Sequence, residues 1–141
     1  MPMKTTNNIR RIQYFYVTVQ DQPGEAYQIL DQLAGLGVNL LALTVIPFGP
    51  HTTQMTIFPE DASEFQRITQ QAGLQAFGPN PAILVQGDDK VGALSEIHRV
   101  LFMAGVNVSA SSGVSDGKGD FGYVIYVRPE AFETASQALG I

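Results

Sequence analysis

Two short turns in the sequence carry residue types suited to binding a small charged molecule. Asp21-Gln22-Pro23-Gly24 and Asp89-Lys90-Val91-Gly92 each come just before a segment with helical periodicity. Glycine at such a turn lets the backbone approach a ligand closely, and the unpaired N–H groups of a first helical turn favour a carboxylate. The chemistry predicted for these turns is binding and not bond breaking. An ordinary turn, in which each aspartate only stabilises a helix start, explains the same residues.

An asparagine follows each of the two helices, in Gly37-Val38-Asn39 and Gly105-Val106-Asn107. Its side-chain amide offers both a donor and an acceptor, so it could hydrogen-bond an amino group or a carboxylate from across an interface between two domains. The same pattern is also that of an ordinary helix end that leads into a strand.

The other reactive residues form no catalytic set. The sequence has no cysteine, and its two histidines, His51 and His98, are far apart and have no Asp or Glu at metal-ligand spacing. The segment 117–122 matches the dinucleotide pattern G-x-G-x-x-G, but it lies between two expected strands and not before a helix. We find no nucleophile, base and oxyanion donor together. The sequence therefore predicts a protein that is not an enzyme and that needs no cofactor and no metal.

An internal repeat explains why the two turns are alike. Residues 17–42 set against residues 85–110 agree at nine of 26 positions. The agreements fall on turns and expected core positions: Val17/Val85, Asp21/Asp89, Gly24/Gly92, Ile29/Ile97, Leu33/Leu101, Gly37/Gly105, Val38/Val106, Asn39/Asn107 and Ala42/Ala110. We interpret the chain as two copies of one unit, joined at residues 78–81.

The first copy has the pattern of four strands and two helices. The strands are expected at residues 14–19, 38–46, 52–58 and 74–77. Apolar residues three and four positions apart predict a first helix, which ends at Gly37. Asp61 predicts the start of the second helix, because its carboxylate can cap the helix and Glu64 stands in the capping-box position.

The second copy repeats this order without a final strand. Strands are expected at 82–86, 106–114 and 123–127, and helices around Ile97 and Ala135. The predicted fold is α+β, with two ferredoxin-like βαββαβ units packed as a pseudo-twofold pair, the second lacking its last strand. The expected boundaries are an N-terminal tail at residues 1–12, a first unit at 13–78 and a second unit at 79–141.

The repeated motifs resemble those of the ACT domain, a regulatory module attached to many enzymes of amino-acid metabolism. Residues 21–24 with 37–40 match its pattern of an acidic or amide residue, any residue and Pro-Gly, then Gly-(Ile/Val)-Asn-(Ile/Leu) about a dozen residues later. Residues 89–92 with 105–108 repeat it with Val91 in place of proline, and Ala26 departs from the leucine that the family prefers. The resemblance covers residues 13–141 and implies an amino acid held between two domains. The ligand-binding residues that it implies are Asp21, Gln22, Gly24, Asn39, Asp89, Lys90, Gly92 and Asn107.

Composition and charge exclude several other classes. A net charge of −5 disfavours nucleic acid and anionic membranes as partners, and we expect the basic residues Lys4, Arg10 and Arg11 to lie in a solvated tail. No secretory or membrane-spanning segment is present, so we expect a cytoplasmic protein. We predict a homodimeric regulatory protein that binds a small amino acid and acts on a metabolic enzyme. The alternative is an interaction module without a ligand, which binds a partner protein at the sheet edge left open by the missing strand.

Overall fold

A computed structural model describes residues 7–141. They form two compact units, one of Gln13–Asn80 and the other of Pro81–Ile141 with the described residues up to Ile12. The elements are β1 (Asn8–Gln20), α1 (Glu25–Gly35), β2 (Leu40–Pro47), β3 (Thr52–Pro59), α2 (Ala62–Ala72), β4 (Phe77–Asp88), α3 (Ala93–Met103), β5 (Ala110–Ser115), β6 (Asp120–Tyr126), the 3₁₀ turn η1 (Pro129–Ala131) and α4 (Phe132–Ala138). The expected position of Lys4 lies outside the described residues. Among those described, no helix has the length and apolarity needed to cross a membrane.

In the unit of Gln13–Asn80, both helices cover one face of an antiparallel sheet. β3 pairs with β1 through Val17↔Met55 and with β2 through Leu43↔Ile57. Alternate residues of β1 and β3 point to the same face, so their apolar side chains meet those of α1 and α2. The buried core that results consists of Phe15, Val17, Leu33, Met55, Ile57 and Phe65.

Both helix ends predicted in this unit are confirmed. Gly37 follows α1 with φ 79°, and its N–H bonds the Ala34 carbonyl while Val38 bonds the Leu33 carbonyl. This pair of bonds is the Schellman motif, which needs the left-handed conformation that glycine adopts freely. Asp61 caps α2 by accepting a hydrogen bond from the Glu64 backbone N–H at 3.0 Å.

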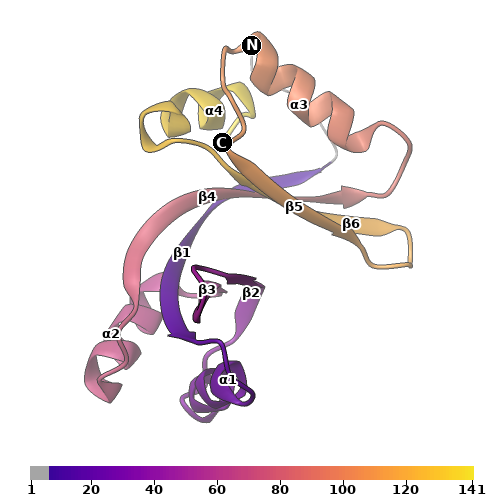
Figure 1. Cartoon of the computed structure of the whole chain (residues 1–141). Coiled ribbons are helices and arrows are strands. Elements are labelled where there is room, and N and C mark those ends of the chain that lie inside the picture. Colours follow the sequence, from indigo (N-terminus) through magenta and orange to yellow (C-terminus); the bar gives the residue numbers. More distant parts are fainter. Residues whose placement is uncertain (1–6) are drawn as a thin grey trace. The chain divides into compact units, whose positions relative to one another are not determined.

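The unit that contains Pro81–Ile141 repeats this layout. β6 pairs antiparallel with both β4 and β5, and α3 and α4 lie on the same side of these strands (Figure 1). Its core joins the inward face of β4 and β6 to one stripe of each helix: Ile83, Val85, Ala93, Ile97, Leu101, Val106, Phe121, Tyr123, Ile125, Val127, Ala135 and Leu139. The α+β fold of two ferredoxin-like units that the sequence predicts is confirmed.

The start of the chain supplies the strand that the second copy lacks. The hydrogen-bonded strand order is β2-β3-β1-β4-β6-β5, so β1 lies beside β4. Ile9 of β1 packs against the core of the second unit. The Arg11 guanidinium donates to the Glu133 carboxylate at 2.8 and 3.2 Å and to the Ile141 carbonyl at 3.1 Å. Residues 8–12 therefore differ from the expected tail, because they continue β1 with Ile9 packed against the core and Ile12 buried. The edge on which the interaction-module alternative depended is occupied.

The two strands expected on either side of the join are one strand, β4. Residues 74–76 are not in it, and Leu74 and Ala76 pack against the core of the first unit instead. The strand runs through the prolines of the join, where the Asn80 side-chain amide donates to the Tyr14 carbonyl at 3.4 Å. Gly78 is required there, since a Cβ would lie 2.7 Å from that same carbonyl oxygen.

Candidate functional site

The turn before α3 opens onto a cavity of about 490 Å³. Three of the predicted ligand-binding residues, Asp89, Lys90 and Gly92, line it together. The remaining wall comes from the first turn of α3 and from the β5–β6 hairpin: Ala93, Leu94, Ser95, Gly113, Val114, Ser115, Phe121 and Gly122. The cavity therefore combines one carboxylate and one ammonium group with an apolar wall.

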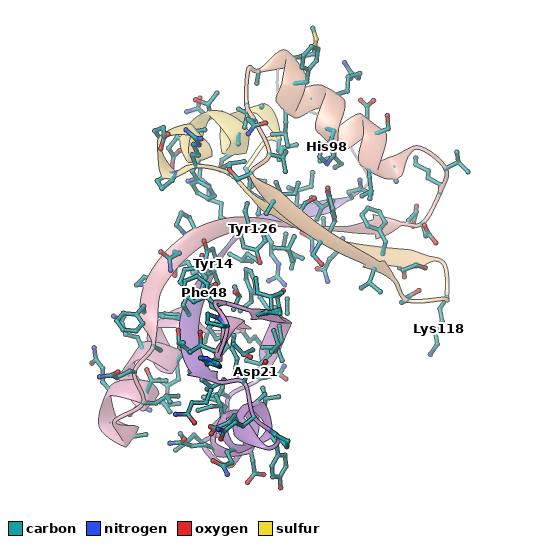
Figure 2. The ribbon with its side chains drawn as sticks, in the orientation of Figure 1. Tyr14, Asp21, Phe48, His98, Lys118 and Tyr126 are labelled. Atoms are coloured by element: carbon teal, nitrogen blue, oxygen red, sulfur yellow. The ribbon has the colours of Figure 1, made fainter. Side chains whose placement is uncertain are left out.

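Hydrogen bonds to the β5–β6 hairpin hold Asp89 in this cavity. The Asp89 backbone N–H donates to the Gly119 carbonyl at 2.8 Å, and the Ser115 hydroxyl donates to its carboxylate at 3.0 Å. Asp116 shapes the hairpin by accepting the Lys118 N–H at 2.6 Å, an Asx turn. Figure 2 shows Lys118 at the tip, pointing away from the ribbon. The segment 117–122 is thus the hairpin end that the sequence predicts.

The helices that follow the two turns begin without a side-chain cap. Gly24 and Gly92 are the N-cap residues of α1 and α3, with φ of 89° and 85°, and neither helix start donates a backbone N–H to a capping side chain. The contrast is α2, whose start is capped by Asp61. Because the first backbone N–H groups of a helix have no partner within the helix, the starts of α1 and α3 remain favourable places for an anion.

The turn before α1 is built like its counterpart. The Asp21 backbone N–H donates to the His51 carbonyl of the β2–β3 hairpin at 2.9 Å, as Asp89 donates to the other hairpin. Asp21 and Gln22 are exposed (Figure 2 labels Asp21). Pro47 stands where Ser115 stands in the second copy, so no hydroxyl is available there to hold the Asp21 carboxylate.

Asn39 lies apart from the turn of its own copy. Its side-chain amide donates to the Glu60 carboxylate at 2.9 Å, and its carbonyl accepts the Glu60 backbone N–H at 2.9 Å. It lines a second cavity, of about 530 Å³, at the start of α2. The 11 residues of α1 separate it from Gly24 by about 16 Å. One amino acid therefore cannot contact the turn and the asparagine of the same unit.

Asn107 is exposed and does not line the cavity at α3. Arg128, 68 residues after Glu60, occupies the place of the carboxylate that holds Asn39 in the first copy. An arginine cannot accept a hydrogen bond from an amide, so the pair found in the first copy has no equivalent here. The structure thus brings together three of the eight predicted residues, those of the turn before α3.

Sequence reasoning missed the part of the cavity that comes from the β5–β6 hairpin. Ser115 and Phe121 face each other across the hairpin and lie far from the turn in sequence. The signal that could have found them is the strand register, which places the residues flanking the glycine-rich tip beside the start of the helix. Nearby, His98 is half-buried and bonded to the Tyr123 hydroxyl at 2.6 Å, as expected of a residue at the boundary of the core.

The acidic residue in the first turn of α3, Glu96, is held in an ion pair. Arg99 donates hydrogen bonds to Glu96 at 2.6 and 3.0 Å. These bonds lower the pKa of the Glu96 carboxyl group below its ordinary value. Arg67 lowers the pKa of Glu64 on α2 in the same way. Both ion pairs are exposed, so each lowers the pKa of its carboxyl group but adds little to the stability of the fold.

Comparison with known proteins places the fold. No family model matches the sequence, and no curated protein matches it. Solved structures do. A protein from Bacteroides thetaiotaomicron has a TM-score of 0.77 at 14% identity, over 93% of this chain and 88% of that one. The regulatory subunit of aspartate kinase from Thermus thermophilus, in its ligand-free form, has a TM-score of 0.64 at 19% identity, over 96% and 95%.

A third similar structure, the regulatory subunit of aspartate kinase from Thermus flavus, has a TM-score of 0.59 at 18% identity, over 96% of this chain and 95% of that one. At such identities the likeness concerns the fold. It extends over nearly the whole of each chain, and it agrees with the ACT-like fold that the repeated motifs imply.

Proposed function

We propose that this chain is a non-enzymatic regulatory protein of amino-acid metabolism that binds a small amino acid. The observation that carries this proposal is the cavity at the start of α3, where Asp89, Lys90 and an uncapped helix start line one space. A free amino acid carries an ammonium and a carboxylate on one carbon. The Asp89 carboxylate is complementary to the ammonium group of such a ligand, and the Lys90 ammonium group with the helix start is complementary to its carboxylate.

The apolar part of the cavity suits the side chain of such a ligand. Ala93, Leu94 and Phe121 supply it, and pockets for small ligands are mostly apolar with a few placed polar groups. The regulatory subunits of aspartate kinase, which have a similar fold, support a regulatory role for this chain. A bound ligand would act by stabilising one state of the protein, and an enzyme partner would then bind that state preferentially.

A thermal-shift screen with the twenty protein amino acids tests the proposal. A ligand at 100 times its Kd stabilises the folded state by about 2.7 kcal/mol, which raises Tm by about 5–10 °C for a chain of this size. The matched control is the amide of each active amino acid, which keeps the side chain and the ammonium group but loses the carboxylate. We expect the amide to lose most of the shift. A flat response to all twenty amino acids would contradict the proposal.

A second candidate function is docking of a protein through strand β2. β2 is an end strand in the hydrogen-bonded order, and it exposes four large apolar side chains in and just after the strand: Leu43, Val45, Ile46 and Phe48. An exposed apolar edge strand is a template for pairing with another chain. A second copy of this chain, giving the expected homodimer, or a metabolic enzyme could pair there.

Sedimentation of two matched variants tests this candidate. Val45→Lys places a charge in the middle of β2, and Ser112→Lys places one on β5, the strand at the other end of the order. We expect the first to shift the protein toward monomer and the second to leave its mass unchanged. Equal behaviour of both variants and the parent protein would refute a homodimer interface at β2.

A further inference from the structure

We infer that the two copies are not equivalent as binding sites, and that the chain binds one amino acid, at α3 and not at α1. This inference rests on the proposed function and adds to it the number of ligands and the residue that selects between the copies. Because the turns occupy matching positions 68 residues apart, each difference between them can be compared directly.

The first difference is the cation. Lys90 lines the cavity at α3, is exposed, and makes no ion pair within the described part of the chain. The matching residue at α1 is Gln22, which is neutral. A carboxylate that enters the second copy therefore meets an unpaired ammonium group, whereas one that enters the first copy meets an amide.

The second difference is an anion already present at the helix start. Glu25 is the first residue of α1 and places a carboxylate in its first turn, while Ala93 stands at the matching position of α3, whose own first-turn acid, Glu96, is paired with Arg99. An acidic side chain in the first turn interacts favourably with the helix dipole. The Glu25 carboxylate thus already provides the negative charge that the start of α1 favours, and it repels the carboxylate of a ligand.

Two further acidic residues at this end of the second unit lie on the other face of the sheet. Asp88 pairs across the sheet with Asp120, while their neighbours Gly87 and Phe121 pair on the core side. Since successive side chains of a strand point to opposite faces, the carboxylates of Asp88 and Asp120 lie on the face away from α3. Of the charged residues at this end of the unit, Asp89 and Lys90 line the cavity.

Calorimetric titration of the full chain with each of the twenty protein amino acids in turn tests the inference. For any amino acid that binds, we expect one site per chain. Lys90→Gln makes the second turn resemble the first, and we expect it to weaken binding about tenfold, since a hydrogen bond to a charged group at an exposed site is lost. The matched control, Gln22→Ala, should leave the affinity within about twofold of the parent. Both residues are exposed, so both variants should retain the parent circular dichroism spectrum.

The outcomes separate this inference from the proposed function. Two sites per chain, or equal weakening by both variants, would overturn the inference while amino-acid binding itself stands. Loss of binding in Gln22→Ala with full affinity in Lys90→Gln would overturn it as well, because the site would then lie at α1. Absence of heat with every amino acid would instead remove the proposed function and the inference together.

Discussion

The contribution of the first strand to the fold is open to a sharp test by Ile12→Ala. The Ile12 side chain, in the part of β1 that belongs to the second unit, is 6% exposed. Truncating a buried isoleucine to alanine costs about 2–5 kcal/mol. We expect about 2–3 kcal/mol for Ile12, which lowers Tm by about 4–12 °C for a chain of this size.

Urea unfolding followed by circular dichroism measures this cost, with Arg10→Ala as the control. Arg10 lies in the same strand but is exposed, so its truncation should change the free energy of unfolding by less than about 0.5 kcal/mol. If Ile12→Ala is as stable as Arg10→Ala, residues 8–12 are a solvated tail and the second unit lacks its fourth strand after all.

Two further predictions concern the second unit. Gly113→Ala places a Cβ 2.7 Å from Cδ1 of Tyr123, so we expect a loss of about 1–3 kcal/mol in urea unfolding; Gly122→Ala, whose Cβ meets no atom within 4 Å, should lose much less. Glu96 should titrate below its ordinary value of 4.5 in an NMR titration, because Arg99 hydrogen-bonds its charged form. Its small contribution to stability is present at neutral pH and is lost as the pH falls through the lowered pKa, and Arg99→Gln should return the titration midpoint to about 4.5.

Local patterns in the sequence predict most of the fold. The helix stop at Gly37 and the cap at Asp61 depend on residues within one turn of each other, and both are confirmed. The duplicated order of elements follows from the same local signals, repeated 68 residues later. Such features are encoded in neighbouring residues, which is why a single sequence suffices to find them.

Pairing between distant segments could not be predicted in this way. β1 extends to Asn8 beside β4, and the Arg11–Glu133 ion pair of this segment joins residues 122 positions apart. Likewise, the hairpin wall of the cavity depends on the register of β5 against β6. Both arise from the tertiary arrangement of segments whose local composition, two arginines in one case and glycine and serine in the other, favours a tail or a loop.

Amide chemical shifts of the labelled protein, recorded during titration with each amino acid, test the central claim most directly. The account predicts saturable shifts for at least one amino acid, concentrated at residues 89–95 and at the hairpin residues 113–115 and 121–122 that line the same cavity. Shifts that never saturate, or that saturate only at residues outside this cavity, would contradict the claim that the start of α3 receives an amino acid.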